Sequence, residues 1–413
     1  MKKNIFCVTI LFLLINPVLW SQWFPQHSDF PLTSPYFSLW AIDTNTAIVG
    51  TIYYGVRTSN GGTNWVYNLN PSGYIDDYYF INSTTGFMVD REGYPSGSRL
   101  YKSTNAGLSW DTLPHLPVLS SYSLSFNDAN TGYASTLGAV YKTTNGGFSW
   151  VNTYTELTNV QKIFFVDANT GWGITDIGNV IKTTNGGGFW DITTVDPGNS
   201  LNNLFFINGN TGWIAGSNSS VYKSTNNGWS PWVDHQIALP TCELDAVYFA
   251  NDMTGWVTGC NGSIHRTTDG GITWIQQTIG ATTRLYRIQF VNALTGWAAG
   301  ESGVILHTTN GGVSPNGIQP IGNSIPKQIS LSQNYPNPFN PATKIRFDIP
   351  KESLAKIEVY DVSGRTVDII VNENLKAGTY QVDFNGNSLA SGVYYYRLTA
   401  GDFVETKKMI LLK

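Results

Sequence analysis

The chain has 413 residues, of which 41% are hydrophobic, 14% aromatic and 13% charged, and its formal net charge is -4. This composition excludes a disordered chain and leaves room for more than one folded domain. The mild excess of acidic residues disfavours a nucleic-acid partner. The 42 glycines and the low charge content favour many short strands and tight turns over helices.

The first 21 residues have the pattern of a secretory signal peptide. Lys2 and Lys3 precede a mostly apolar run from Ile5 to Leu19, and cleavage is expected close to Gln22. No later run is long enough to span a bilayer, so we expect no transmembrane segment after cleavage.

Two cysteines follow the signal peptide, Cys242 and Cys260. They flank a predicted hairpin whose turn centres near Asn251, which places them on facing strands. In an exported protein this arrangement favours a disulfide bond, with two buried free thiols as the alternative. No cluster of His or carboxylate residues accompanies them, so we predict no metal site there.

Residues 143–150, Thr-Thr-Asn-Gly-Gly-Phe-Ser-Trp, belong to a motif that recurs along most of the chain. Asn-Gly is a strong hairpin signal, because both residues tolerate positive φ and the Asn side chain bonds the backbone two residues on. We interpret each copy as a structural turn between two strands, and the Trp that ends most copies as a packing residue. The seven copies lie 40 to 45 residues apart and place their turn residues at Asn60, Asn105, Asn145, Asn185, Asn226, Asp269 and Asn310.

A second signature precedes each turn, as in Phe165–Trp172 and Phe206–Trp213. It predicts a strand, a polar turn and a second strand. An alternating segment such as residues 139–142 adds a third strand, and the Trp-led segment adds a fourth. Four antiparallel strands repeated about every 40 residues form the blades of a β-propeller. We therefore predict an all-β fold in which residues 22–314 form a seven-bladed β-propeller.

The two ends of the repeat array predict closure into a ring. The seventh copy stops near Pro315 without a Trp or a fourth strand, whereas Gln22–Gln26 resembles the fourth strand Trp274–Thr278. We expect the segment of Trp23 to complete blade seven, which leaves no sheet edge open.

The composition changes after the repeats. Residues 315–328 are rich in Pro, Gly and Asn, which is typical of a linker. Residues 344–349 and 356–362 then read as strands, and residues 380–384 alternate again. About seven short strands fit a small Ig-like β-sandwich. We expect this second domain to cover residues 329–413.

The repeat unit resembles known families. Its turns resemble the Asp-box, or bacterial neuraminidase (BNR), repeat. Together with the Thr-Gly-Trp hairpin they are most similar to the photosystem II stability and assembly-factor propellers and their non-photosynthetic relatives. The resemblance covers roughly residues 23–314, and it implies a fold rather than a function. Asn takes the place of Asp at six of the seven turns.

Residues 329–413 resemble the type A C-terminal sorting domain of the type IX secretion system. The resemblance rests on Asn334–Thr343, Val359–Gly364, Leu389–Tyr394 and Thr406–Lys413. It implies handling by that secretion machinery, which belongs to particular Gram-negative bacteria. The implied route is export to the periplasm, passage across the outer membrane, and removal of the domain as the protein is attached to the cell surface or released.

The repeats show no catalytic constellation. A sialidase needs an arginine cluster, yet Arg57 and Arg266 fill a third-strand position that is Lys in most other copies. The five histidines are scattered without metal-ligand spacing, and the Asp-Ala-Asn-Thr-Gly turns lack the further acidic ligands that calcium takes. We predict no metal and no cofactor.

Function is expected on variable loops held by the rigid ring. The loops between second and third strands and those between blades fall on one face, opposite the repeat turns. Aromatic side chains beside carboxylates there suit a glycan. We predict a secreted or surface-displayed, non-catalytic propeller that binds a glycan or a protein partner, with a purely structural role as an alternative. The candidate ligand-binding residues are Tyr53, Tyr54, Tyr74, Asp76, Asp77, Arg91, Glu92, Tyr94, Arg284, Tyr286, Arg287 and Glu301.

A secreted glycoside hydrolase of sialidase-like or related propeller type is the alternative with chemistry. It needs two carboxylates about 5 to 9.5 Å apart across a pocket. The candidates are Asp76, Asp77, Glu92, Asp176 and Glu301. The sequence favours a binding protein over this enzyme.

Overall fold

The computed structural model describes residues 23–26, 34–69, 73–91, 97–117, 120–237, 239, 242–277, 279, 282–312, 318–321, 325–386 and 389–412. Within these ranges there are strands and turns but no α-helix, which confirms the predicted all-β class. The chain forms two compact units, with the boundary between Ser314 and Pro315. The predicted signal peptide, residues 1–21, lies outside the described residues. The short 3₁₀ turns are η1 (Ser217–Ser219), η2 (Cys260–Gly262) and η3 (Glu301–Gly303).

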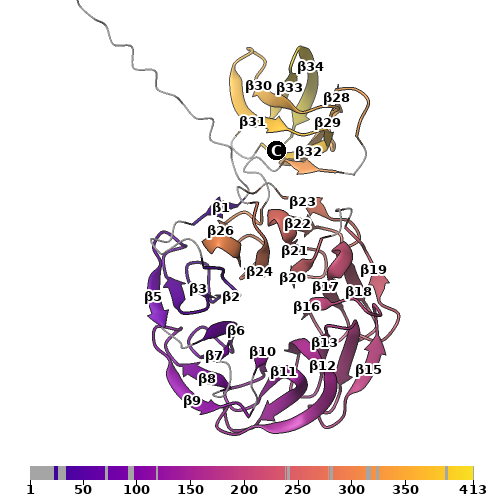
Figure 1. The fold of residues 1–413 in the computed structure, drawn as a ribbon. Helices are drawn as coiled ribbons and strands as arrows, with labels where there is room; N and C mark the ends of the chain where they lie inside the picture. The colour runs from indigo at the N-terminus through magenta and orange to yellow at the C-terminus, as the bar shows by residue number, and fades with distance from the viewer. Residues whose placement is uncertain are drawn as a thin grey trace, which may run out of the picture. The chain divides into compact units, whose positions relative to one another are not determined.

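The unit formed by residues 22–314 is a ring of antiparallel sheets whose first strands lie nearest the centre (Figure 1). Five of the sheets in its described part have four strands. From the inner strand outward, the first two sheets contain β2 (Ser38–Ala41), β3 (Ala47–Gly50), β4 (Gly55–Thr58) and β5 (Val66–Leu69), and β6 (Tyr74–Phe80), β7 (Gly86–Arg91), β8 (Ser98–Ser103) and β9 (Asp111–His115). The next two contain β16 (Leu201–Phe206), β17 (Gly212–Gly216), β18 (Val221–Ser224) and β19 (Val233–Asp234), and β20 (Leu244–Phe249), β21 (Gly255–Gly259), β22 (Ile264–Thr267) and β23 (Ile275–Gln276). The last contains β24 (Leu285–Phe290), β25 (Gly296–Gly300), β26 (Ile305–Thr308) and β1 (Phe24–Pro25).

One further sheet of the ring has six strands, because two of its strands are long and each pairs in two places. The first half of β11 pairs with β10 and its second half with β12, whose own second half pairs with β13. The six are β10 (Ser121–Phe126), β11 (Gly132–Thr143), β12 (Val151–Phe165), β13 (Gly171–Thr175), β14 (Asn179–Thr183) and β15 (Asp191–Thr194).

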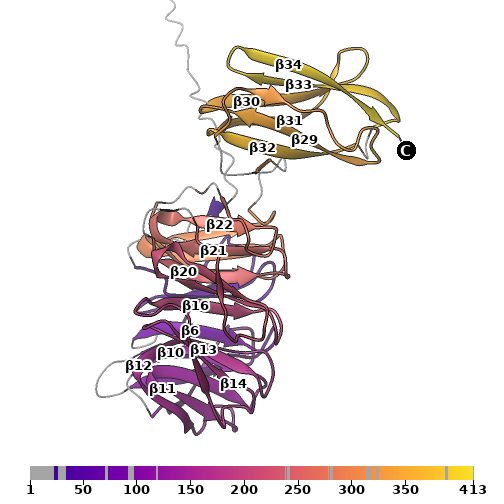
Figure 2. The ribbon, with the colours of Figure 1, turned by 90° about the vertical axis from the view of Figure 1, so that its right-hand side faces the viewer.

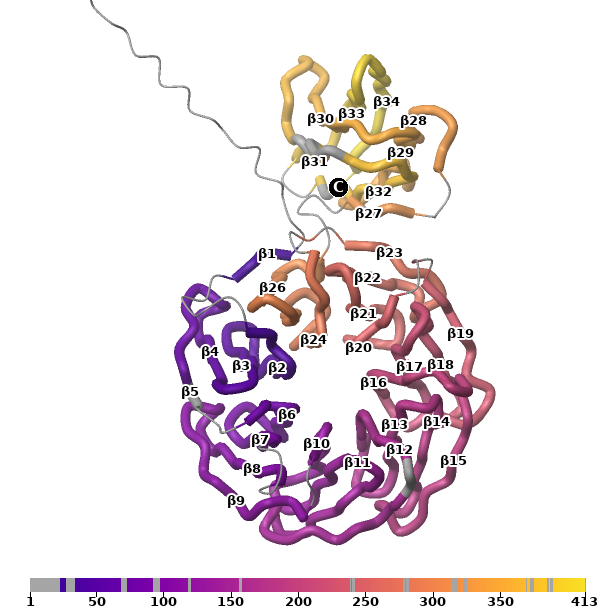
Figure 3. Tube along the Cα trace, in the orientation of Figure 1, coloured from indigo at the N-terminus to yellow at the C-terminus, as the bar shows by residue number. Residues whose placement is uncertain are grey.

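The N-terminal strand β1 is the outer strand of the last sheet, beside β26 (Figure 3). Phe24 pairs with His307 and Pro25 with Leu306. Trp23 is fully buried, and its ring meets Phe290 edge-on at 5.6 Å between centroids. The first and last segments of the ring therefore share one sheet.

An aromatic contact repeats where neighbouring sheets meet. The Trp213 ring stacks on Phe249 of the next sheet at 3.5 Å between centroids, and its Nε1 donates to the Gly270 carbonyl at 3.0 Å. Gly255 leaves space for the Phe249 ring, since a Cβ there would lie 2.6 Å from it. The Phe and the Gly-Trp of the repeat are therefore packing residues. Equivalent stacks between sheets join Phe87 to Phe126, Trp172 to Phe206 and Trp256 to Phe290. Within the six-stranded sheet, Tyr133 of β11 stacks in the same way on Phe165 of β12.

The repeat turn is held by its own polar side chains. Thr143 Oγ1 donates to Asn145 Oδ1 at 2.9 Å and accepts the Gly147 N–H at 2.9 Å. Asn145 Oδ1 also accepts the Ser149 N–H, and Gly146 and Gly147 have φ of 70° and 94°. These bonds explain why the turn needs a hydroxyl, an amide or carboxylate, and glycine. The Thr or Ser hydroxyl meets the turn residue in the same way at Asn60, Asn105, Asn185, Asn226, Asp269 and Asn310.

A disulfide bond joins Cys242, which precedes β20, to Cys260 in η2. Cys242 lies just before the β20–β21 hairpin and Cys260 just after it, at the end where Leu244 pairs with Gly259. The bond therefore attaches the segment that enters this sheet to the loop between its second and third strands.

The described part of the second unit forms two four-stranded sheets (Figure 2) that share one apolar core containing Ile345, Val382, Ile357 and Leu398. Part of the predicted linker belongs to this unit: Ile318 is buried in its core, and β27 within residues 315–328 pairs with β32. The strands are β27 (Gln319–Pro320), β28 (Ser330–Leu331), β29 (Ala342–Ile349), β30 (Ser353–Tyr360), β31 (Thr366–Leu375), β32 (Gly378–Asn385), β33 (Gly392–Ala400) and β34 (Phe403–Leu411).

Candidate binding site at the centre of the ring

The described inner strands of the ring, except β2, carry β-bulges at matching positions. In β20, for example, Leu244 pairs with Gly259 and Ala246 with Thr258, so Asp245 is left without a partner on β21. A bulge leaves its extra residue unpaired and re-aims that side chain. The residues skipped in this way in the described inner strands are Asp76, Tyr122, Gln161, Asn202, Asp245 and Tyr286.

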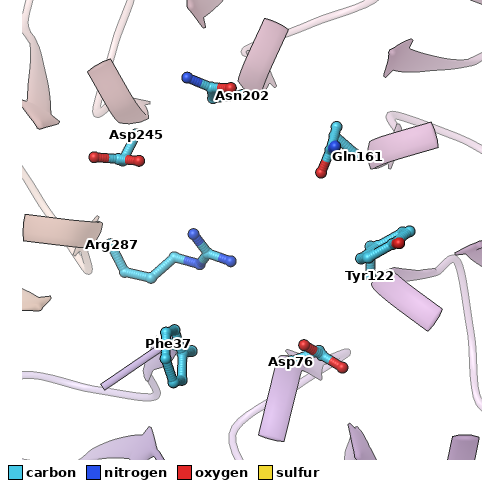
Figure 4. Close-up of a pocket in the computed structure, with 7 residues that line it drawn as sticks. All are labelled: Phe37, Asp76, Tyr122, Gln161, Asn202, Asp245 and Arg287. Atoms are coloured by element: carbon cyan, nitrogen blue, oxygen red, sulfur yellow. The ribbon is translucent and has the colours of Figure 1, made fainter. Parts of the chain in front are cut away.

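A pocket of about 200 Å³ lies among these bulges. Its side chains come from different sheets and surround one common space (Figure 4). The fold thus assembles the pocket from residues far apart in the sequence. The lining residues are Phe37, Asp76, Tyr122, Gln161, Asn202, Asp245 and Arg287.

Asp76 is a buried carboxylate of the pocket, and only one of its two oxygens is hydrogen-bonded. The residue is only 8% exposed, and Arg91 Nη2 donates to its Oδ1 at 2.9 Å. Its buried Oδ2 has no hydrogen-bond partner within the described residues. Burial raises the pKa of Asp76 to about 7, although the positive charges of Arg91 and Arg287 oppose that rise. Asp76 therefore presents an unused acceptor that titrates near neutral pH.

Arg287 supplies the positive charge of the pocket. Its side chain extends into the space between Asp76 and Asp245 (Figure 4). Nη1 donates to the Tyr286 carbonyl at 2.9 Å, whereas the buried Nε has no acceptor in the described part of the chain. An unpaired buried donor costs free energy unless a ligand or water meets it. Arg287 is therefore suited to hold a hydrogen-bond acceptor.

Asp245 is already held by a neighbouring sheet. Arg284 donates from Nε and Nη2 to its two oxygens, each at 2.7 Å, and also pairs with Glu243. Burial raises the pKa of Asp245, and the hydrogen bonds from Arg284 oppose this rise. Glu301 accepts the Tyr286 hydroxyl at 3.0 Å. This cluster braces the wall of the pocket rather than offering free ligand groups.

Aromatic rings beside the pocket are covered by other side chains. Phe37 stacks on Tyr286 at 5.5 Å and lies 5.8 Å from Tyr74. The Arg91 guanidinium lies over the rings of Tyr74 and Tyr122 at 5.1 and 5.8 Å. Arg284 likewise lies over Tyr286 at 5.5 Å. These contacts occupy ring faces that a sugar would otherwise use.

The structure brings together most, but not all, of the residues predicted from the sequence. The side chain of Asp77 contacts residues of the neighbouring six-stranded sheet instead of the pocket. Its Oδ2 accepts hydrogen bonds from the Leu124 N–H and from Lys162 Nζ, each at 2.9 Å. Tyr53 is 62% exposed, and Tyr54 meets Tyr67 of the outer strand β5. Glu92 and Tyr94 lie outside the described residues. The predicted residues at or next to the pocket are Tyr74, Asp76, Arg91, Arg284, Tyr286, Arg287 and Glu301.

Five pocket residues were not predicted, namely Phe37, Tyr122, Gln161, Asn202 and Asp245. A signal for most of them is present in the sequence. The bulge residue stands four positions before the Phe of the second signature, as Asp245 does before Phe249 and Tyr122 before Phe126. Aligning the repeats on that Phe identifies the ring of bulge side chains.

The described residues contain neither a membrane-spanning helix nor a metal-binding cluster. No helix there has the length and apolar character needed to cross a membrane. No three His, Cys, Asp or Glu side chains there are grouped so that they could hold a metal ion.

Comparison with known proteins finds a similar family for part of each unit. Residues 229–331 match the family model described as photosynthesis system II assembly factor YCF48, and residues 333–412 match the secretion system C-terminal sorting domain. The first unit therefore has the fold of a β-propeller, and the second unit is similar to a sorting domain. More particularly, the chain fuses a propeller similar to YCF48 to a type IX secretion tail. The tail implies a secreted or cell-surface protein of a Gram-negative bacterium that the secretion machinery handles.

A curated relative supports the first match. The chain is 29% identical over 108 residues to the chloroplastic photosystem II stability/assembly factor HCF136 of Oryza sativa subsp. japonica. The aligned region is 25% of this chain and 26% of that protein, so the chain spans about a quarter of the relative's length.

Solved structures show the likeness in fold. The structure described as YCF48 bound to D1 peptide has a TM-score of 0.58 at 17% identity and covers 70% of this chain and 98% of that one. YCF48 from Cyanidioschyzon merolae gives 0.58 at 18% identity, covering 69% and 98%. The GH74 enzyme of Niastella koreensis gives 0.60 at 12% identity, covering 91% and 72%. At these identities the likeness concerns the fold alone.

Proposed function

We propose that this secreted propeller is non-catalytic and binds an extended segment of a protein partner in the pocket at the centre of its ring. The proposal rests on one observation: Asp76 Oδ2 and Arg287 Nε are buried beside the same pocket, and neither has a hydrogen-bond partner among the described residues. A peptide backbone carries N–H donors and C=O acceptors, so one segment can satisfy both groups.

The covered aromatic rings favour a peptide over a glycan. Sugar binding uses open ring faces, whereas Arg91 and Arg284 lie over the rings of Tyr74, Tyr122 and Tyr286. The fold neighbour described as YCF48 bound to D1 peptide also gives precedent for a peptide on such a propeller. A glycan remains the competing ligand that the binding experiment has to separate.

We also propose the number of blades in the ring, the type of sandwich in the second unit and the bounds of the domains. We count seven blades, because β11 and β12 each pair in two places and so divide the six-stranded sheet into two sets of four. We assign the second unit to the Ig-like sandwiches, on the basis of its two antiparallel sheets around one core. Residues 1–21 would act as the signal peptide, residues 22–314 as the propeller, and the remainder as the linker and sorting domain, with passage through the periplasm.

Binding arrays distinguish the ligand classes. Purified mature protein is applied to a random-peptide array and to a glycan array, beside the variants Asp76→Asn and Phe148→Ala. Phe148 is 61% exposed in a repeat turn and does not line the pocket, so it serves as the control. We expect peptide signals that Asp76→Asn weakens and Phe148→Ala leaves unchanged. Binding confined to glycans, or equal loss in both variants, would overturn the proposal.

Raising the pH from 6 to 8 should tighten the binding of an array-selected peptide. Asp76, whose pKa is raised to about 7, is mostly protonated at pH 6 and mostly ionised at pH 8. A donor binds a charged acceptor more strongly than a neutral one by about 1 kcal/mol, which predicts roughly a fivefold gain. Titration calorimetry measures it, and Asp76→Asn should flatten the profile. A wild-type affinity that falls with pH would contradict this role of Asp76.

A glycoside hydrolase is the second candidate, favoured by one observation. Asp76 has the raised pKa that suits a general acid, and it shares the pocket with Asp245. Against this reading, Arg284 occupies both oxygens of Asp245. Asp77 and Glu301 are also engaged, with Lys162 and Tyr286. Release of sugars from a panel of polysaccharides, abolished by Asp76→Asn, would establish the hydrolase; no release by wild-type protein would eliminate it.

A further inference from the structure

The proline-rich segment at the start of the sorting domain, residues 334–341, contains two kinds of residue. One kind holds the fold. Asn334 is 2% exposed and donates from Nδ2 to Thr343 Oγ1 at 3.0 Å, while its backbone N–H donates to the Tyr396 hydroxyl at 2.8 Å. Removing this side chain would leave buried polar groups without partners.

Asn337 and Phe339 attach the same segment to the last strand. Asn337 Oδ1 accepts the Ile410 N–H at 2.9 Å. Phe339 is 1% exposed, and its N–H donates to the Ile410 carbonyl at 2.9 Å. The Asn and Phe residues of the segment are thus explained by the stability of the sandwich.

Tyr335 is of the second kind, because its side chain does not hold the fold together. It is 80% exposed, the highest value for any large hydrophobic side chain in the described ranges. Its backbone exchanges two hydrogen bonds with Lys344, each of 3.0 Å. Its side chain has no hydrogen bond, ring contact or cation contact among the described residues. The fold holds this residue in place by its backbone and leaves the ring in solvent.

Two cations share its side of the sheet. Tyr335 bridges Lys344 in antiparallel register, and side chains of directly paired residues lie on the same face. Along β29 exposed and buried residues alternate, so Lys344 and Arg346 both face outward. Residues 327–413 contain more Lys and Arg than Asp and Glu, whereas residues 22–326 contain fewer. An exposed Tyr beside Lys and Arg therefore lies on the basic part of an otherwise acidic chain.

We propose that Tyr335, Lys344 and Arg346 form the surface by which the sorting domain docks on a protein of the secretion machinery. The partner surface would offer an apolar slot for the Tyr335 ring and an acidic residue for Arg346. Lys344 already pairs with Asp383 at 3.1 Å, and both of these side chains are exposed at the edge of the surface. Tyr and Arg are the side chains that most often dominate protein interfaces. The match of residues 333–412 to a sorting domain supplies the kind of partner, since a sorting domain acts by being recognised.

Secretion of the full-length chain in its native host tests this surface. The fraction in the medium and on the cell surface is compared with the cell-retained fraction by immunoblot. Tyr335→Ala should lower the exported fraction roughly tenfold, as loss of an interface anchor does, and Tyr335→Phe should restore it. Lys344→Glu with Arg346→Glu should also reduce export. Val362→Ala, at a residue that is 75% exposed in a turn, is the matched control and should be exported normally.

Thermal melting of the purified variants separates docking from folding. Tyr335→Ala should melt with the wild type, whereas Phe339→Ala, which opens the core, should melt several degrees lower. Normal export of Tyr335→Ala would overturn the proposal. So would a drop in its melting temperature equal to that of Phe339→Ala, or an equal export defect in Val362→Ala.

Discussion

Replacing Trp23 with alanine should destabilise the ring by about 4 kcal/mol, the usual cost of removing a fully buried Trp. Trp23 has no exposed surface, and it packs in one cluster with Trp256, Phe290 and Leu306. A loss of this size should lower the melting temperature of the mature protein by about 10 °C.

Deletion of residues 23–26 should have a larger effect, since it also removes strand β1 and the Gln26 N–H bond to the Ile305 carbonyl. The outer edge of β26 would then be open to pairing with other chains. Phe24→Ala is the matched control, because Phe24 is 43% exposed. If Trp23→Ala melted with the wild type, β1 would not be what closes the ring.

Replacing Arg287 with alanine should weaken binding of an array-selected peptide about 30-fold or more. Truncating one partner of a buried, charged hydrogen bond typically costs 2 to 5 kcal/mol, much of it from the group left unpaired. Arg287 is the arginine that lines the pocket, and its positive charge also lowers the pKa of Asp76. Calorimetric titration of the peptide into mature protein measures the change.

Two further variants test whether the loss of affinity is specific to the guanidinium of Arg287. Arg287→Lys keeps the charge but loses the planar donor set, so it should recover only part of the affinity. Arg365→Ala removes an arginine whose side chain is 77% exposed in the other unit, and it should bind as the wild type does. Wild-type affinity in Arg287→Ala would place the peptide elsewhere on the protein.

Local turn chemistry made much of the ring predictable. The Thr-x-Asn-Gly-Gly turn is specified by its own side chains, as the bonds among Thr143, Asn145 and Gly147 illustrate. The Phe and Gly-Trp signature is equally local in sequence, although its partner is the next sheet, as with Trp213 and Phe249. Repetition of both signatures therefore predicted the order of the strands within a repeat without knowledge of long-range contacts.

The pocket was harder to predict, because β-bulges set the direction of its side chains. Regular alternation along β20 would put Asp245 on one face of its strand, but the bulge turns it to the pocket. The loop position of Tyr54 suggested the binding face, and its ring contacts Tyr67 of the outer strand β5. Charged pairs such as Asp77 with Lys162 join residues 85 positions apart, which sequence spacing does not reveal.

Composition also misplaced one boundary. The Pro, Gly and Asn content of residues 315–328 indicated a linker throughout, yet Ile318 is buried in the second unit. Pro320 lies in the short edge strand β27, where a missing N–H is tolerated. One buried apolar residue and two paired positions attach residues 318–320 to the second unit.

Photo-cross-linking can locate the bound peptide on the ring. Mature protein carrying the substitution Tyr122→benzoylphenylalanine, in the pocket, is irradiated with the array-selected peptide, and adducts are mapped by mass spectrometry. Phe148→benzoylphenylalanine, at an exposed repeat-turn position that does not line the pocket, is treated in parallel. Binding in the pocket predicts adducts from position 122, suppressed by excess unlabelled peptide, and none from position 148. Adducts from position 148 alone would contradict it.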